Sequence, residues 1–129
     1  MKSETIKVLL IDDDEDDFLL TRELLSAVKI GMYELDWADS YEEGLRVVGR
    51  GEHDVCLVDY RLGEHNGVQL IREARESRLN MPMILLTGQG DHDVDVEAME
   101  AGATDYLVKD ETNASVGTCA ARHLARKVS

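Results

Sequence analysis

The chain has 129 residues, of which 43% are hydrophobic and 32% are charged, a composition typical of one globular domain with a hydrophobic core. Its formal net charge of −13 at pH 7 argues against nucleic acid and anionic membranes as partners, because both attract basic surfaces. We therefore expect a protein that acts without nucleic acid and without a membrane.

The sequence shows no pattern of membrane insertion or secretion. No apolar run approaches the roughly 20 residues that span a bilayer, and no signal-peptide pattern opens the chain. Cys56 and Cys119 have neither a CxxC nor a metal-binding spacing, which favours two reduced thiols. We expect a single domain over residues 1–129, located in the cytoplasm.

Apolar and amphipathic segments alternate along the chain. Five short apolar runs predict strands that are buried on both faces, at Ile6–Ile11, Tyr33–Ala38, Val55–Val58, Met83–Leu86 and Tyr106–Val108. The amphipathic segments predict helices at Glu15–Lys29, Ser40–Arg50, Val68–Ser77, Val94–Ala101 and Thr112 to about Val128. Strict alternation implies parallel strands with right-handed crossovers, and hence a three-layer α/β sandwich. The helix at Val94–Ala101 is the weakest of these, since its start also alternates like a strand.

Polar residues follow four of the predicted strands. Asp12 and Asp13 follow the first strand, Asp59 the third, Thr87 the fourth and Lys109 the fifth. In open parallel sheets the ligand binds outside the carboxyl ends of the strands. We therefore expect three carboxylates, one hydroxyl and one ammonium to meet at one edge of the sheet.

These residue types suit phosphoryl transfer. Asp12, Asp13 and Asp59 offer the hard oxygen ligands that Mg²⁺ prefers, and a divalent ion would offset their mutual repulsion. The carboxylate of Asp59 can attack phosphorus and form an aspartyl phosphate. The hydroxyl of Thr87 and the ammonium of Lys109 can bind phosphoryl oxygens, and such positioning and charge neutralisation are the main needs of this reaction.

Other polar residues have structural interpretations. Asp14 can cap the first helix, and Asp16 and Asp17 suit its first turn, where acids interact favourably with the positive end of the helix dipole. The four histidines form no metal-ligand pattern, and we expect all of them at the surface: His53, His65, His92 and His123.

With five motifs in this order, the sequence resembles the receiver domains of two-component response regulators. The motifs are "VLLIDDD", "LVDYRLG", Gly67 eight residues after Asp59, "LLTGQG" and "GATDYLVK", and they span essentially the whole chain. The resemblance implies a flavodoxin-like, doubly wound sheet of five parallel strands in the order 2-1-3-4-5. The sequence differs from the usual family pattern at two places. Asp110 stands where a proline normally follows the lysine, and Leu62-Gly63 stands where Met-Pro is common.

The resemblance also implies a role for each residue at the edge of the sheet. Asp59 matches the phosphoacceptor, Asp13 the direct Mg²⁺ ligand, and Asp12 a partner acid that often acts through water. The backbone carbonyl of Arg61 would complete the metal sphere.

Three further residues match the part of the family motif that responds to phosphorylation. Thr87 and Lys109 match the switch hydroxyl and the lysine that bind the phosphoryl group. Tyr106 matches the aromatic residue that moves together with Thr87.

The resemblance implies a phosphorylation-controlled signalling module rather than an enzyme with an external substrate. A histidine kinase or a histidine phosphotransfer protein would supply the phosphoryl group, and an unidentified protein would read the phosphorylated state. Two alternatives stay open, a degenerate receiver that only docks and a receiver excised from a larger sensor protein. An aspartate-nucleophile phosphatase of the haloacid dehalogenase type is less favoured, because Arg61 stands where its Asp-x-Asp motif needs a second acid.

Overall fold

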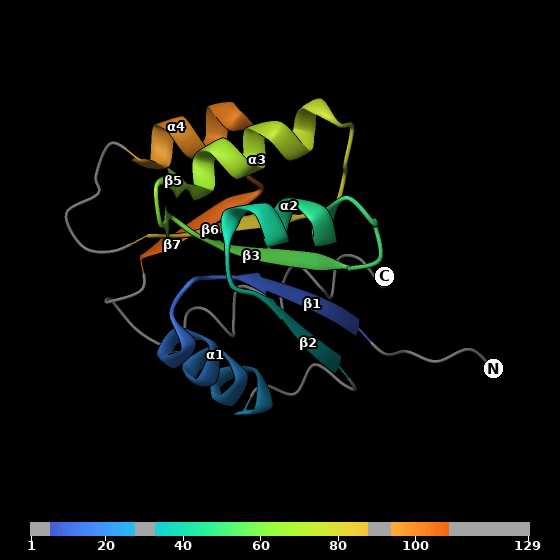
Figure 1. Ribbon diagram of the computed structural model, residues 1–129, viewed down its shortest axis with the longest axis vertical. Helices are drawn as coiled ribbons and strands as arrows, with labels where there is room; N and C mark the ends of the chain where they lie inside the picture. Colours follow the sequence, from blue (N-terminus) through green and yellow to red (C-terminus); the bar gives the residue numbers. More distant parts are fainter. Residues whose placement is uncertain (1–5, 28–32, 88–93, 109–129) are drawn as a thin grey trace.

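The apolar runs pair into one parallel sheet in the computed structural model, which describes residues 6–27, 33–87 and 94–108. The strand order is β2-β1-β3-β6-β7 (Figure 1), and it confirms the predicted order 2-1-3-4-5 of the five long strands. Their bounds lie within one residue of the predicted ones: β1 Ile6–Ile11, β2 Tyr33–Ala38, β3 Val55–Asp59, β6 Met83–Thr87 and β7 Asp105–Val108. The prediction that β2 is buried on both faces is wrong, because β2 is an outer strand and its Glu34 and Asp36 are exposed.

Helices cover both faces of this sheet, as the three-layer prediction requires. The four described helices are α1 Glu15–Ala27, α2 Tyr41–Val48, α3 Gly67–Glu76 and α4 Val94–Ala101. In Figure 1, α2, α3 and α4 lie on one side of the sheet and α1 lies on the other. The helix predicted from Thr112 to Val128 falls outside the described residues. No helix within them is long and apolar enough to cross a membrane.

A short hairpin between β3 and α3 was not predicted. Strands β4 (Arg61–Leu62) and β5 (His65–Asn66) pair antiparallel and are joined by the two residues Gly63 and Glu64. Gly63 has φ +65°, a left-handed conformation that glycine adopts without a steric penalty. The strands have only two residues each, so they are too short to produce a visible period in the sequence.

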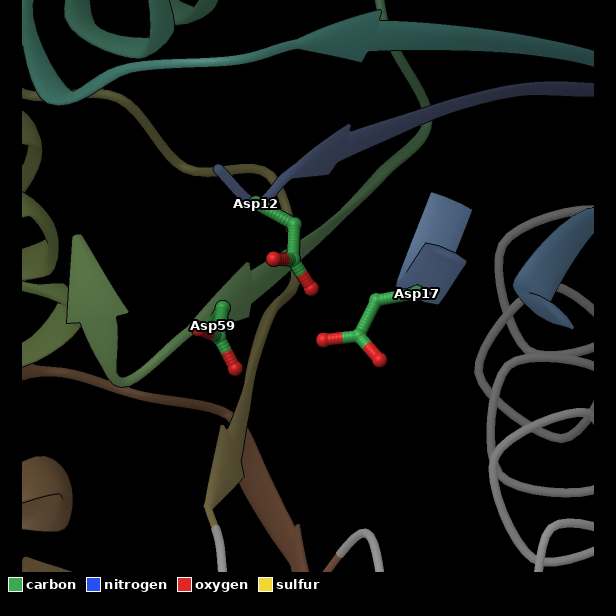
Figure 2. Close-up of side chains that lie close together, drawn as sticks. All are labelled: Asp12, Asp17 and Asp59. Atoms are coloured by element: carbon green, nitrogen blue, oxygen red, sulfur yellow. The ribbon is translucent and has the colours of Figure 1, made fainter. Parts of the chain in front are cut away.

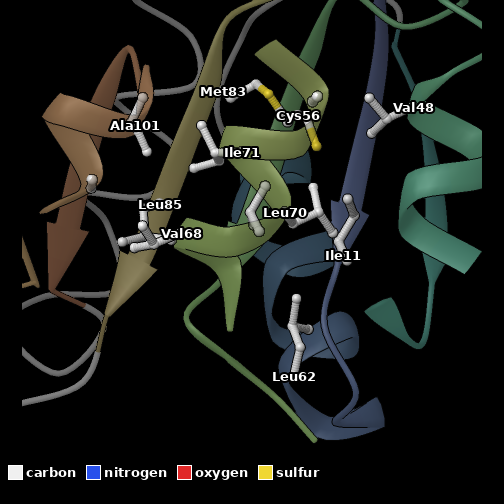
Figure 3. Close-up of a cluster of buried hydrophobic side chains, with 14 of the residues drawn as sticks. Ile11, Val48, Cys56, Leu62, Val68, Leu70, Ile71, Met83, Leu85 and Ala101 are labelled. Carbon is white, nitrogen blue, oxygen red and sulfur yellow. The ribbon is translucent and has the colours of Figure 1, made fainter. Parts of the chain in front are cut away.

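The pleat of the sheet divides the strand residues between the two helix layers. One large core cluster contains Leu9 and Ile11 of β1, Cys56 and Val58 of β3, and Leu85 of β6. Figure 3 shows part of this cluster around α3. The intervening residues are also buried, and because successive side chains of a strand point to opposite faces, they lie on the α1 side: Val8, Leu10, Leu57, Ile84 and Leu86. Counting residues along a strand therefore shows which face of the sheet the side chain at its end lies on.

Cys56 and His53 both have buried side chains. Cys56 is a free thiol in the core, and burial raises its pKa. His53 was predicted at the surface, and that prediction is wrong, since His53 is only 6% exposed. Its Nε2 lies 2.8 Å from Oδ2 of Asp36 on β2, a contact between segments that no local pattern indicates. His65 is exposed, as predicted.

Candidate functional site

Three carboxylates meet at the carboxyl edge of the sheet (Figure 2). Asp12 follows β1, Asp59 is the last residue of β3, and Asp17 lies in the first turn of α1. One oxygen of each carboxylate lies within 4.8 Å of one oxygen of the others. Asp12 is 1% exposed and Asp59 is 7% exposed, while Asp17 is half-buried. We refer to these three residues as the acidic cluster.

The pleat explains why these three side chains share one face. Asp12 is two residues beyond Leu10, and Asp59 is two residues beyond Leu57, so both continue the face that α1 covers. The turn that follows β1 brings the first turn of α1 to the same edge of the sheet. As a result, Asp17 completes the cluster from the helix rather than from a strand.

The start of α1 is fixed by short-range hydrogen bonds. Oδ1 of Asp14 accepts a hydrogen bond of 2.9 Å from the backbone N–H of Asp16, which confirms the predicted cap. Oδ1 of Asp12 accepts a bond of 3.0 Å from the backbone N–H of Asp14. Asp17 lies in the acidic first turn, as predicted, but it also belongs to the acidic cluster. Its second role depends on tertiary packing, which the local pattern does not contain.

The structure places Asp13 apart from the acidic cluster. Asp13 follows Asp12 beyond the end of β1, and its exposed side chain lines a neighbouring surface pocket of about 320 Å³. That pocket lies between α2 and the β4–β5 hairpin, with Tyr41, Leu62 and His65 among its lining residues. The group of close carboxylates therefore contains Asp17 where the sequence analysis expects Asp13. Direct Mg²⁺ binding by Asp13 stays a prediction.

Three of the remaining predicted site residues lie on described strands. Thr87 is the last residue of β6 and is 3% exposed. Tyr106 on β7 stands opposite Leu85 in the register and packs against the core. Arg61 begins the β4–β5 hairpin with an exposed side chain. Lys109 and Asp110 lie outside the described residues, so their predicted positions are not tested.

Gly67 packs directly behind Asp59. A Cβ atom at Gly67 would lie 2.5 Å from the backbone oxygen of Asp59 and 2.7 Å from Cδ1 of Leu85. Its N–H donates a 2.8 Å hydrogen bond to the carbonyl of Tyr60. The first residue of α3 is thus in close contact with the end of β3, and only glycine fits there without displacing the backbone that carries Asp59.

The acidic cluster has the composition of a site for a divalent cation. At an effective dielectric near 20, each pair of carboxylates this close repels by roughly 3 kcal/mol. Three hard oxygen donors within 4.8 Å of one another, two of them on buried residues, fit an ion that prefers oxygen ligands. Such an ion would offset the repulsion. The described residues can therefore hold a metal at the place where the sequence analysis expects one.

Comparison with known proteins gives the family of the chain. The family model described as "Response regulator receiver domain" matches residues 8–118. The chain belongs to this family. Among solved structures, a response regulator receiver domain protein from Clostridium thermocellum superposes with a TM-score of 0.82 at 31% identity, covering 95% of this chain and 97% of that one.

Relatives in curated collections are longer proteins. The two-component response regulator PhoP of Pseudomonas aeruginosa is 34% identical over 104 residues, which are 81% of this chain and 45% of the relative. The regulatory protein AtoC of Escherichia coli is 33% identical over 104 residues, which are 81% of this chain and 22% of the relative. This receiver domain thus spans less than half the length of these regulators.

Asp17 is the member of the acidic cluster that sequence reasoning assigned elsewhere. A usable signal was its position at the start of a helix that directly follows a strand ending in acids. In a βα unit, the turn after the strand brings the first turn of the helix to the carboxyl edge of the sheet. An acid in that turn is therefore a candidate ligand as well as a partner of the helix dipole.

Proposed function

We propose that Asp59 accepts a phosphoryl group from a histidine kinase or a histidine phosphotransfer protein, and that Mg²⁺ bound at the acidic cluster supports the transfer. The observation that carries this proposal is the position of Asp59, buried at the end of β3 with the carboxylates of Asp12 and Asp17 close by. The resemblance adds Asp13 and the carbonyl of Arg61 as further ligands. Bound Mg²⁺ would supply charge neutralisation for the phosphoryl oxygens.

The chain's own residues divide the remaining work. A carboxylate oxygen of Asp59 attacks phosphorus and forms the new O–P bond, while the bond from phosphorus to the donor's histidine nitrogen breaks. The hydroxyl of Thr87 donates to one phosphoryl oxygen, and the ammonium of Lys109 pairs with another. Hydrolysis by water later restores the carboxylate. The domain accelerates only these two steps on itself and turns over no external metabolite.

The experiment that tests this function is transfer from a small phosphodonor. We expect acetyl phosphate to add one phosphoryl group to the purified chain when Mg²⁺ is present, and almost none when EDTA removes it. Intact mass spectrometry measures both results. No added group in excess Mg²⁺ would contradict the proposal.

We also propose that phosphorylation is passed on through Thr87 and Tyr106. Tyr106 stands opposite Leu85, and Thr87 is two residues beyond Leu85 on the same face, so the two side chains are diagonal neighbours on adjacent strands. A shift of Thr87 toward the phosphoryl group would change the packing of Tyr106 and of α4 above it. Val96 and Met99 of α4 are 59% and 49% exposed, and a downstream protein can bind there.

Amide spectra with and without beryllofluoride, a phosphoryl mimic, test the switch. We expect shifts at Thr87, at Tyr106 and along α4, because these elements share one face of the sheet. Shifts confined to Asp59 and the acidic cluster would show that the signal does not leave the site.

A cytoplasmic location is part of the same proposal and agrees with the free thiol of Cys56.

Magnesium is expected to stabilise the folded domain. For a dissociation constant near 1 mM, 10 mM Mg²⁺ adds about 1.4 kcal/mol to the free energy of unfolding, which raises the melting temperature by about 3–8 °C. Asp12→Asn removes a ligand together with a repelling charge. This variant should melt above the wild type without metal and gain little from Mg²⁺.

Asp14→Asn is the matched control for this melt. It removes the same charge outside the acidic cluster and keeps a residue that caps helices equally well. It should gain as much from Mg²⁺ as the wild type does. Equal gains of all proteins in sodium chloride of the same ionic strength would indicate screening and no specific site. The same melts of Asp13→Asn and Asp17→Asn compare two candidate ligands. Asp13 is the ligand that the resemblance implies, and Asp17 is the one that the structure brings to the acidic cluster.

A further inference from the structure

We propose that Trp37 is a positioning residue of the magnesium site, which it shapes by fixing both Asp12 and the first turn of α1. This inference rests on the proposed function, since it assumes that the acidic cluster binds Mg²⁺. Trp37 lies near the end of β2, on an outer strand of the sheet, and its side chain is half-buried. It carries none of the ligand atoms. Its contacts nevertheless join the two segments that carry Asp12 and Asp17.

The first set of contacts holds the backbone of Asp12. The indole Nε1–H of Trp37 donates a 2.7 Å hydrogen bond to the carbonyl of Asp12. On the other side of the same residue, the N–H of Asp12 donates a 3.1 Å bond to the carbonyl of Ala38. Two consecutive residues of β2 thus bind both backbone polar groups of Asp12. These bonds fix the peptide planes on either side of its Cα and hence the direction of the Cα–Cβ bond from which its carboxylate extends.

The second set of contacts holds the start of α1. The indole of Trp37 stacks on the ring of Phe18, with ring centroids 4.7 Å apart and planes inclined by 9°. Phe18 directly follows Asp17, so the stack fixes the helix turn that brings Asp17 to the cluster. The guanidinium of Arg22 lies 5.7 Å from the centroid of the Phe18 ring and adds a cation–π contact from the next turn.

One side chain therefore ties the end of β1 to the start of α1. Repulsion between Asp12 and Asp17 tends to separate these two segments when no cation is present. The hydrogen bond and the stack of Trp37 oppose that separation and keep the carboxylates in a preorganised arrangement. Residues that orient metal ligands in this way commonly change metal affinity by about 10–100-fold when they are replaced.

The test compares Mg²⁺ binding by the wild type, Trp37→Phe and Trp37→Leu, measured by isothermal titration calorimetry. Trp37→Phe keeps an aromatic ring for Phe18 but loses the hydrogen bond to Asp12, and it should bind Mg²⁺ about threefold more weakly. Trp37→Leu loses both contacts and should bind about tenfold more weakly. Thermal melts without metal check that each variant is folded. If Trp37→Leu does not fold, the comparison of Trp37→Phe with the wild type is the test.

Leu35→Ala is the matched control, because Leu35 is a half-buried residue on the same face of β2, two positions before Trp37. It should lower the melting temperature and leave the Mg²⁺ dissociation constant within about twofold of the wild type. The inference would be overturned if the Trp37 variants had the Mg²⁺ dissociation constant of the wild type, or if Leu35→Ala lost as much Mg²⁺ affinity as they do. The proposed function would stand in both cases. A wild type that binds no Mg²⁺ would overturn both the inference and the proposed function.

Discussion

Replacing Asp59 by asparagine is expected to abolish phosphorylation of this receiver domain. The amide of asparagine has nearly the size of the carboxylate but lacks the charged oxygen that attacks phosphorus. Asp59→Asn should therefore fold normally and show no added phosphoryl group after incubation with acetyl phosphate and Mg²⁺, as measured by intact mass. It should also melt above the wild type without metal, since it removes one of three crowded charges.

Asp39→Asn is a suitable control for this loss. Asp39 is an exposed acid that lines the pocket beside the acidic cluster, so the variant has the same change of charge close to the site. It should be phosphorylated to the same extent as the wild type. Labelling of Asp59→Asn at the wild-type level would exclude Asp59 as the acceptor. A melting temperature far below that of the wild type would instead indicate a folding defect.

Replacing Gly67 by alanine is expected to destabilise the domain, although alanine favours helices. Gly67 is the first residue of α3, where the better helix propensity of alanine would add at most about 1 kcal/mol. The new Cβ would lie 2.5 Å from the backbone oxygen of Asp59, a distance that forces the backbone to move. Overpacking of this kind costs about 1–3 kcal/mol, so the clash outweighs the propensity.

We expect Gly67→Ala to lower the melting temperature by about 3–10 °C and to slow phosphorylation, because the displaced backbone carries Asp59, the proposed phosphoacceptor. Gly49→Ala is the control, since Gly49 at the end of α2 has ordinary helical dihedrals and its added Cβ would meet nothing closer than 3.3 Å. It should change the free energy of unfolding by less than about 1 kcal/mol. If Gly67→Ala changes the melting temperature and the phosphorylation rate no more than Gly49→Ala does, the close packing behind Asp59 is not needed for stability or for phosphorylation.

The five strands and the edge of the sheet that carries the acidic cluster could be predicted because they depend on short-range patterns. Runs of apolar residues that are buried on both faces identify β1, β3 and β6. The outer strand β2 differs, because its Glu34 and Asp36 are exposed. The positions of Asp12, Asp59 and Thr87 follow from the rule that the carboxyl ends of parallel strands meet at one edge. The resemblance supplied the strand order, and the sheet confirms it.

The distribution of side chains around that edge could not be predicted in the same way. Asp12 and Asp13 are neighbours in the sequence, yet Asp12 belongs to the acidic cluster and Asp13 lines the pocket beside α2. Asp17 joins the acidic cluster because α1 packs on one particular face, and the buried His53 contacts Asp36 on β2. Each of these outcomes depends on a contact between segments, which no window of the sequence contains.

Mapping the modified residue tests the claim that Asp59 carries the phosphoryl group. Reduction of an aspartyl phosphate with borohydride converts that aspartate to homoserine, which peptide mass spectrometry can locate in the sequence. After incubation with acetyl phosphate and Mg²⁺, we expect homoserine at position 59 and unmodified aspartate at positions 12, 13 and 17. Homoserine at any of those three positions, or a phosphoryl group on a residue other than aspartate, would contradict the claim.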